Sequence, residues 1–326
     1  MIVMTDFKNL LKLENIEEIS NQLQDFIKIQ VKENLRKKGV VIGLSGGIDS
    51  SVTSALSVKA LGHENVLGLI LPEKESNPKS ENLAKSLAAN LDIETKKIDL
   101  TSILDAFDIY KIREEIVQKY FPPFDKKCIY RLTVPQNAVL TGGLRIPFLE
   151  VQDGDNQVHK FRLNPIDFST LTSATSVKHR TRMTMLYYFA EKNNLAVLGS
   201  TNKSEYIQGY FVKYGDGGVD LEPLQHLYKT QVYQLGHYLN IPETILSRKA
   251  SPDTWSFEVS DEDFFYGVDY ETLDILWYAK ENNISLENMS EFVNLEKNQI
   301  ENLISYLEKR WKSSSHMREM PSSIKL

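Results

Sequence analysis

A run of glycines and serines, Gly43-Leu44-Ser45-Gly46-Gly47-Ile48-Asp49-Ser50-Ser51, contains the residue types that bind phosphate. Glycines let the backbone approach an anion closely, so that successive N–H groups converge on it. The hydroxyls of Ser45, Ser50 and Ser51 can add further donors. The carboxylate of Asp49 would repel phosphates unless a divalent cation lay between them. We therefore expect this run to bind a nucleotide's phosphates and Asp49 to be a Mg²⁺ ligand.

The alternative is an ordinary Gly-Gly turn with a serine or aspartate cap, which is common where a strand meets a helix. The order Ser-Gly-Gly-x-Asp-Ser directly after an apolar run makes that alternative the weaker one. The run also lacks the lysine of a Walker A loop. It resembles instead the pyrophosphate-binding loop of the N-type ATP pyrophosphatases, which cleave ATP between its α and β phosphates.

Motifs in the second half of the chain resemble one family of that superfamily, the NAD⁺ synthetases. They are Gly199-Ser200-Thr201-Asn202-Lys203-Ser204-Glu205, then Gly209 to Asp220 (GYFVKYGDGGVD), Pro223-Leu224, and Leu227-Tyr228-Lys229-Thr230-Gln231. Ser251-Pro252-Asp253-Thr254-Trp255 and Ser314-Ser315-His316-Met317-Arg318, with Pro321, resemble two further family segments. Order and spacing both match, and the resemblance covers about residues 20–119 and 170–325.

The resemblance implies a reaction and a role for each matched residue. ATP would activate a carboxylate as an adenylate, and ammonia would then displace AMP to leave an amide. Gly43 to Ser50 would hold the ATP phosphates, Asp49 and Glu205 would hold Mg²⁺, and the acceptor would be nicotinate adenine dinucleotide (deamido-NAD⁺). The implied ATP contacts are Ser200, Lys229 and Ser251, and the implied acceptor contacts are Arg180, Lys213, Asp220 and His316.

Elementary chemistry agrees with these assignments. A carboxylate that attacks the α-phosphorus brings two anions together, so a metal ion and Lys229 would have to screen the charge. Ammonia is mostly protonated at neutral pH, so a carboxylate such as Asp216 could bind ammonium and take up its proton. Taken singly, Lys229 could be a solvated lysine and His316 a tail residue without a partner. Their joint order on one chain favours the functional reading.

The elements that must position these residues alternate between strands and helices. Apolar runs predict strands at 40–44, 66–71, 96–100 and 195–198. Helical periodicity predicts helices at 16–37, 50–61, 79–91, 102–119, 177–193 and 228–240, and a mostly helical tail from 269 to 312. This alternation predicts a doubly wound parallel α/β sheet, which the resemblance implies is adenine nucleotide α-hydrolase-like. We expect one domain over residues 1–326, with a helical C-terminal region.

Three features depart from the family pattern. Residues 120–165 form a probable insertion, with a predicted hairpin at 148–151 and 158–163 around Asp153-Gly154-Asp155-Asn156. It contains Arg131, Arg145 and Cys128, the last expected to be structural or incidental. Ser176-Val177-Lys178-His179-Arg180-Thr181-Arg182-Met183 keeps two family arginines but lacks the expected Asn and Ala, and Met317 replaces a Lys. The insertion could cover the site, form a dimer edge or reshape the acceptor pocket.

These departures leave two alternatives open. One is a paralogue that amidates another carboxylate, such as a sugar acid of surface polysaccharide synthesis. The other is a non-catalytic nucleotide-binding sensor, which the retention of Asp49 and Glu205 opposes. A tRNA-modifying enzyme would want basic patches and often cysteines for sulfur transfer, and neither is evident.

Composition narrows the partners. The formal net charge is −6 and only one cysteine is present, so we expect neither nucleic-acid binding nor an internal disulfide, and we expect a cytoplasmic location. No stretch of eighteen apolar residues occurs, so we expect no membrane association. A glutaminase domain would need about 200 more residues and a catalytic cysteine, so ammonia should come free or from a separate partner. The resemblance implies a homodimer.

Overall fold

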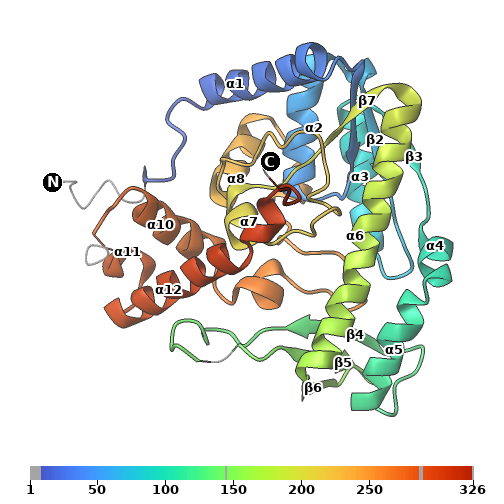
Figure 1. Ribbon diagram of the computed structural model, residues 1–326, viewed down its shortest axis with the longest axis vertical. Helices are drawn as coiled ribbons and strands as arrows, with labels where there is room; N and C mark the ends of the chain where they lie inside the picture. The colour runs from blue at the N-terminus through green and yellow to red at the C-terminus, as the bar shows by residue number, and fades with distance from the viewer. Residues whose placement is uncertain (1–8, 144, 286–288, 325–326) are drawn as a thin grey trace.

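A four-stranded parallel sheet forms the centre of the computed structural model, which describes residues 9–143, 145–285 and 289–324 (Figure 1). Its strand order is β3-β2-β1-β7. The strands are β1 (Gly39–Gly43), β2 (Val66–Ile70), β3 (Glu94–Lys97) and β7 (Leu195–Leu198). The predicted parallel sheet is therefore confirmed, although the third strand begins and ends earlier than the predicted 96–100. All four residues of β3 are exposed, because it is the edge strand.

Helices cover both faces of this sheet, because β1 is apolar on both sides. Val40 and Ile42 pack into one hydrophobic cluster and Val41 into another, and all three are almost fully buried. Strands buried on both faces are the rule in parallel sheets. The first face carries α1 (Ile16–Ile29), α2 (Ile48–Leu61), α3 (Pro78–Asn90) and α8 (Lys229–Tyr238). The second carries α4 (Thr101–Ala106), α5 (Ile109–Tyr120) and α6 (Pro165–Asn193).

Two predicted helices differ from those observed. The helix expected over 102–119 is in fact α4 followed by α5, because Asp108 adopts the left-handed conformation (φ 55°) between them. The helix expected over 177–193 begins twelve residues earlier, at Pro165. Asn164 caps that start by accepting a hydrogen bond from the N–H of Asp167. An Asn-Pro pair at the start of a helix is a sequence signal that the periodicity did not reveal.

A three-stranded antiparallel sheet occupies the region of the predicted insertion. Its strands are β4 (Ile129–Thr133), β5 (Phe148–Gln152) and β6 (Val158–Arg162), in that order. The predicted hairpin is β5-β6, whereas β4 was not predicted. Cys128 is buried, with its Sγ 3.4 Å from an oxygen of Asp125. Apolar residues of this sheet pack with α5 and with Trp255, so the segment is part of the body of the molecule.

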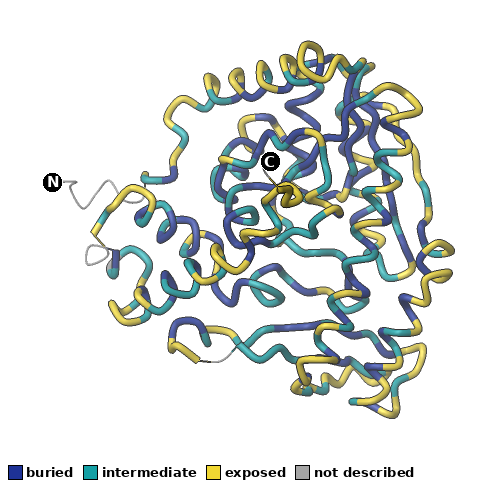
Figure 2. Tube along the Cα trace, viewed as in Figure 1, coloured by how far each residue is buried: buried dark blue, intermediate teal, exposed yellow. Residues whose placement is uncertain are grey.

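The C-terminal region is helical, as expected, and forms its own apolar cluster beside the sheet (Figure 1). Figure 2 shows that these helices bury one side and expose the other. The remaining elements are η2 (Gln30–Asn34), η3 (His63–Asn65), α7 (Lys203–Gln208), α9 (Glu243–Leu246), η4 (Glu262–Tyr266), α10 (Tyr270–Glu281), α11 (Ser290–Val293), α12 (Lys297–Ser313) and α13 (Ser315–Arg318). No helix in the described ranges is long and apolar enough to cross a membrane.

Candidate active site

The loops that follow β1 and β7 meet at the carboxyl end of the sheet. β1 leads through residues 44–47 into α2, and β7 leads through residues 199–202 into α7. β1 and β7 are neighbouring strands, but the connections that follow them lead to different parts of the molecule. A crevice therefore opens between the two connections. A cavity of about 1040 Å³ lies there, lined by residues of both loops. It is the place where the fold itself leaves room for a ligand.

The glycine-rich loop has the backbone that anion binding needs. Gly46 adopts φ 72°, and a Cβ there would lie 2.5 Å from the carbonyl oxygen of Ser80. Gly47 caps α2 without a side chain, so the N–H groups at the positive end of that helix remain accessible. The hydroxyls of Ser45 and Ser50 lie 3.0 Å apart, and both residues line the cavity. This geometry suits the phosphate binding that the sequence predicts, which stays a prediction.

Ser51 does not take part in that geometry. It is fully buried, and its hydroxyl donates to the carbonyl oxygen of Gly47 at 2.7 Å. It is absent from the residues that line the cavity. The expectation that its hydroxyl adds a phosphate donor is therefore wrong, because α2 turns its side chain into the core.

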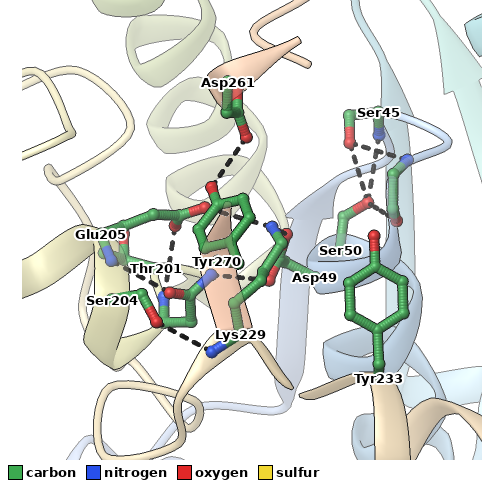
Figure 3. Close-up of polar contacts among 12 residues, drawn as sticks. Ser45, Asp49, Ser50, Thr201, Ser204, Glu205, Lys229, Tyr233, Asp261 and Tyr270 are labelled. Carbon is green, nitrogen blue, oxygen red and sulfur yellow. Dashed lines mark hydrogen bonds and ion pairs between the residues drawn. The ribbon is translucent and has the colours of Figure 1, made fainter. Parts of the chain in front are cut away.

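Asp49, Glu205 and Lys229 form a cluster at the cavity wall (Figure 3). The ammonium of Lys229 lies 2.5 Å from Asp49 Oδ2 and 3.4 Å from Glu205 Oε1. Asn202 donates from Nδ2 to the other oxygen of Asp49 at 2.9 Å and also caps α7. Three residues distant in sequence thus meet because they begin α2, α7 and α8.

The charges in this cluster depend on one another. Lys229 is only 2% exposed; burial opposes its charge, but Asp49 and then Glu205 outweigh burial and raise its pKa. Burial raises the pKa of Glu205 well above its usual value, and the negative charges of Asp49 and Asp261 add to that effect. Asp261 accepts hydrogen bonds from Tyr210 and Tyr270 at 2.8 and 2.9 Å, and its own pKa is raised by burial. The cluster therefore holds more acid than one lysine neutralises.

This donor set suits a divalent cation that is shared with a nucleotide. Among the described residues no group of three or more acids, histidines or cysteines could hold a metal unaided. Mg²⁺ commonly uses one or two carboxylates and completes its coordination with substrate phosphates and water. Asp49 and Glu205 supply two carboxylates beside the glycine-rich loop. A bound cation would favour the ionised form of Glu205 and so lower its raised pKa. The residues thus fit the metal that the sequence suggested.

Asp216 lines the same cavity and pairs with a histidine from α6. His179 Nδ1 lies 3.2 Å from Asp216 Oδ1, which also accepts the backbone N–H of Val212 at 2.9 Å. Burial alone would raise the pKa of Asp216, but His179 and these hydrogen bonds outweigh it and lower the pKa. A carboxylate with a lowered pKa binds cations well and accepts protons poorly. The expected proton-accepting role therefore suits the pair better than Asp216 alone.

The cavity brings together most, but not all, of the predicted site residues. Twelve of them line it: Gly43, Leu44, Ser45, Gly47, Ile48, Asp49, Ser50, Ser200, Glu205, Asp216, Lys229 and Ser251. Gly46 does not line the cavity, but its left-handed conformation sets the path of the loop. The four expected acceptor contacts, Arg180, Lys213, Asp220 and His316, are not part of the lining.

Those four residues make other contacts. Arg180 is exposed, with its Nε 3.4 Å from the carbonyl oxygen of Lys213. Lys213 donates to the carbonyl oxygens of His316 and Glu319, at 2.6 and 3.0 Å. Asp220 accepts the N–H of Val197 at 2.7 Å and so binds the strand β7. They lie outside the cavity, and only a ligand extending beyond it could reach them.

Sequence reasoning missed several cavity residues. Asn202, which lies beside the lining rather than in it, stood within a quoted motif, and its role as cap follows from the Asn-x-x-Glu capping pattern. Its hydrogen bond to Asp49 depends on the tertiary structure. Arg182 was noted only as a retained arginine. Arg145 was noted only as an arginine of the insertion, and nothing in the local sequence marked Arg248, Asp261 and Arg310, which also line the cavity.

Comparisons with known proteins identify relatives over most of the chain. A family model described as NAD synthase matches residues 19–121 and 148–321. The chain is similar to the NH(3)-dependent NAD(+) synthetase of Rhizobium meliloti (strain 1021), with 36% identity over 291 residues, 89% of this chain and 87% of that protein.

Two solved structures are also similar. The NMN synthetase of Francisella tularensis matches at a TM-score of 0.65 and 25% identity, over 95% of this chain and 99% of that one. The NH3-dependent NAD synthetase of Campylobacter jejuni subsp. jejuni matches at 0.63 and 26%, over 96% and 100%. Residues 122–147, within the predicted insertion, are the internal segment that the family match leaves out.

Proposed function

The chain belongs to the NAD synthase family, and we propose that it uses ATP to amidate the nicotinate carboxylate of deamido-NAD⁺ with ammonia, releasing AMP and pyrophosphate. The observation that carries this function is the meeting of the glycine-rich loop with Asp49, Glu205 and Lys229 in one cavity. The loop offers N–H and hydroxyl donors to the phosphates. The cluster offers a fixed positive charge and two acids beside them.

We assign each part of this cluster a role in forming the adenylate. Lys229 keeps its proton because its pKa is raised, so its ammonium can neutralise charge at the pyrophosphate as it leaves. Asp49 and Glu205 would hold Mg²⁺, which would supply further charge neutralisation at the phosphates. Ser200 and Ser251, which both line the cavity, would contact ATP. Burial of the cluster strengthens each of these interactions relative to water.

The second step needs unprotonated ammonia near the adenylate. We assign ammonium binding to Asp216, whose pKa is lowered, and proton uptake to the pair that it forms with His179. Arg180, Lys213, Asp220 and His316 lie outside the cavity lining. They could bind only an acceptor that extends out of the cavity, which a dinucleotide is long enough to do.

Nicotinate mononucleotide is the second acceptor to compare with deamido-NAD⁺. The similarity to the NMN synthetase of Francisella tularensis favours nicotinate mononucleotide as the alternative substrate. It carries the same nicotinate carboxylate and a single phosphate. A sugar acid, as a paralogue would use, is the control acceptor from another chemical class.

The test supplies the purified protein with ATP, Mg²⁺, ammonium and each acceptor in turn, and measures AMP and the amide product. We expect NAD⁺ and AMP in equal amounts with deamido-NAD⁺ and the largest kcat/KM with that acceptor. A larger kcat/KM with nicotinate mononucleotide would show that this compound, rather than deamido-NAD⁺, is the acceptor. If AMP forms only with a sugar acid, the protein is a paralogue that amidates another carboxylate. If AMP forms with no acid, the result favours the non-catalytic nucleotide sensor.

Asp49→Asn tests the cluster itself. The amide keeps the size of the side chain but removes the charge that faces Lys229 and the proposed metal, so we expect kcat to fall by about 100-fold or more. Asp105→Asn, on the exposed side of α4, is the matched control and should keep full activity. An Asp49→Asn protein that makes AMP at the wild-type rate would refute the assignment. We further propose a cytoplasmic location and free or partner-supplied ammonia.

A further inference from the structure

Two arginines line the cavity without an acidic partner among the residues that the structure describes. Arg145 lies in the segment before β5, and Arg310 lies in the last turns of α12. Arg145 donates to the hydroxyl of Tyr306 and to the carbonyl oxygen of Phe265. Arg310 donates to the carbonyl oxygen of Gln208 at 3.0 Å. The Nε atom of each is buried and has no hydrogen-bond partner in the described ranges.

The absence of an acid sets this pair apart from the buried cations elsewhere in the chain. Lys178 and Arg113 pair with Glu73 and Glu75, and Lys229 pairs with Asp49 and Glu205. Burial and, to a smaller extent, the nearby charge of Arg310 together lower the pKa of Arg145 to about 10. Holding two like charges out of water is unfavourable unless an anion joins them. Two positive side chains without an acid therefore make this part of the cavity favourable for an anion.

Aromatic rings connect this pair to the acidic cluster. Arg310 lies over the ring of Phe265 at 4.3 Å, and Phe265 stacks on Tyr210 at 4.3 Å. Tyr210 in turn donates to Asp261, beside Lys229. Arg145 lies over Tyr306 at 4.7 Å. Guanidinium groups that aromatic rings hold in place suit a phosphate, because their planar forks can bind its oxygens.

We propose that Arg145 and Arg310 bind the diphosphate of the acceptor dinucleotide, in a part of the cavity distinct from the glycine-rich loop. This rests on the proposed function for the identity of the ligand, but not for the existence of an anion site. The cavity of about 1040 Å³ is at the upper limit of the ~300–1,000 Å³ that single-ligand sites span, which leaves room for ATP and an acceptor together. Arg145 belongs to the segment outside the family match, so this chain contributes the contact through its own insertion.

Steady-state kinetics test the assignment to the acceptor. Arg145→Gln and Arg310→Gln should each raise KM for deamido-NAD⁺ about tenfold or more, the loss of one charge-assisted interaction, while KM for ATP changes less than about twofold. Arg162→Gln, an exposed arginine on β6 outside the cavity, is the matched control and should change neither constant. Arg145→Lys and Arg310→Lys keep the charge and should recover part of the affinity. An unchanged KM for deamido-NAD⁺, or a rise in KM for ATP instead, would overturn the assignment.

Binding of inorganic pyrophosphate tests the anion site independently of the reaction. With the glycine-rich loop filled by α,β-methylene-ATP, calorimetry should detect one pyrophosphate site in the wild type and none in Arg145→Gln/Arg310→Gln. If the wild type binds pyrophosphate there but never amidates deamido-NAD⁺, the proposed function falls and the anion site stands. If the double variant binds pyrophosphate as the wild type does, the anion site falls. Circular dichroism of each variant distinguishes a lost site from a lost fold.

Discussion

Glu222 is a half-buried carboxylate beside the loop that follows β7. It accepts the N–H of Thr201 at 2.9 Å, and the space above it exists because residue 199 is glycine: a Cβ there would lie 2.4 Å from the carboxylate. Burial, with a smaller effect from the negative charge of Asp216, raises the pKa of Glu222 to about 8. At neutral pH this side chain is therefore a neutral acid that supports the cavity loop.

The raised pKa predicts how stability depends on pH. The folded protein binds a proton at Glu222 between its usual pKa of 4.5 and about 8, where the unfolded chain does not. Stability from this group is therefore present below pH 4.5 and is lost as pH rises to 8. Glu222→Gln keeps the acceptor for Thr201 without the proton, so it should gain at least about 1 kcal/mol over the wild type at pH 8 relative to pH 5. Urea unfolding at both pH values measures this.

The matched control is Glu115→Gln, which changes a water-exposed carboxylate on α5. It should show the same stability difference from the wild type at pH 5 and at pH 8. A Glu222→Gln protein whose difference is equally flat would mean that the carboxylate is charged in the folded protein, and the argument above would fail.

At the scale of elements, a buried ionic network ties together the loops that enclose the cavity. Lys178 of α6 donates to Glu73 at 2.8 Å, to Glu75 at 2.5 Å and to the carbonyl oxygen of Thr254 at 3.1 Å. Arg113 of α5 reaches Glu75 and the same carbonyl oxygen. The loop after β2 and the loop that contains Ser251 are thereby fixed to two helices. The glycine-rich loop then faces a defined opposite wall.

Lys178→Met should lower the free energy of unfolding by about 3–5 kcal/mol at pH 7, because it leaves the buried carboxylate of Glu73 without its cation, whereas Glu75 keeps Arg113. Burial alone would raise the pKa of Glu73, but Lys178 outweighs burial and the pKa is lowered. Stability from this pair is present above pH 4.5 and is lost as pH falls through the lowered pKa. The difference from the wild type should therefore shrink in acid, as chemical unfolding at a series of pH values would show.

Lys74→Met is the control for this network. Lys74 pairs with Glu114 at 3.2 Å, but its side chain is 52% exposed, so the change should cost less than about 1 kcal/mol. Equal losses from Lys74→Met and Lys178→Met would contradict the claim that burial decides the difference.

At the scale of the whole molecule, the cavity is shared among all the layers. The parallel sheet, the antiparallel sheet and the C-terminal helices each contribute lining residues. A ligand that leaves this cavity would cross the surface of one protomer, where Arg180 and His316 lie exposed. If the protein is a homodimer, as the resemblance implies, a second copy would complete the binding site for this outer part of the acceptor.

We predict that light scattering will give about twice the 37.4 kDa of one chain. Phe26 and Ile29 of α1 are apolar yet 39% and 44% exposed, which makes this helix a candidate interface. Phe26→Glu/Ile29→Glu should then give the mass of one chain, whereas Lys28→Glu, on the same helix, should leave the mass unchanged. A wild type that already measures as one chain would rule out the dimer.

The glycine-rich loop, the strands that flank it and the helical tail could be predicted from sequence because they depend on local rules. The conformation at Gly46, the continuous apolar run of β1 and the helix after Gly47 each follow from neighbouring residues. Helix ends were harder: the break at Asp108 is a left-handed residue that few side chains adopt, and periodicity does not detect it. Such details depend on single conformations rather than on patterns.

Which side chains lie together in the cavity follows from long-range packing and could not be derived from local sequence patterns. Asp49 and Glu205 are 156 positions apart, and they meet because β1 and β7 are adjacent strands. The contacts of His179 with Asp216, and the lack of a partner for the Nε atoms of Arg145 and Arg310 in the described ranges, depend on packing between distant elements. The sequence by itself determined the residue types and the class of chemistry, whereas distance, burial and charge balance come from long-range contacts that local patterns do not encode.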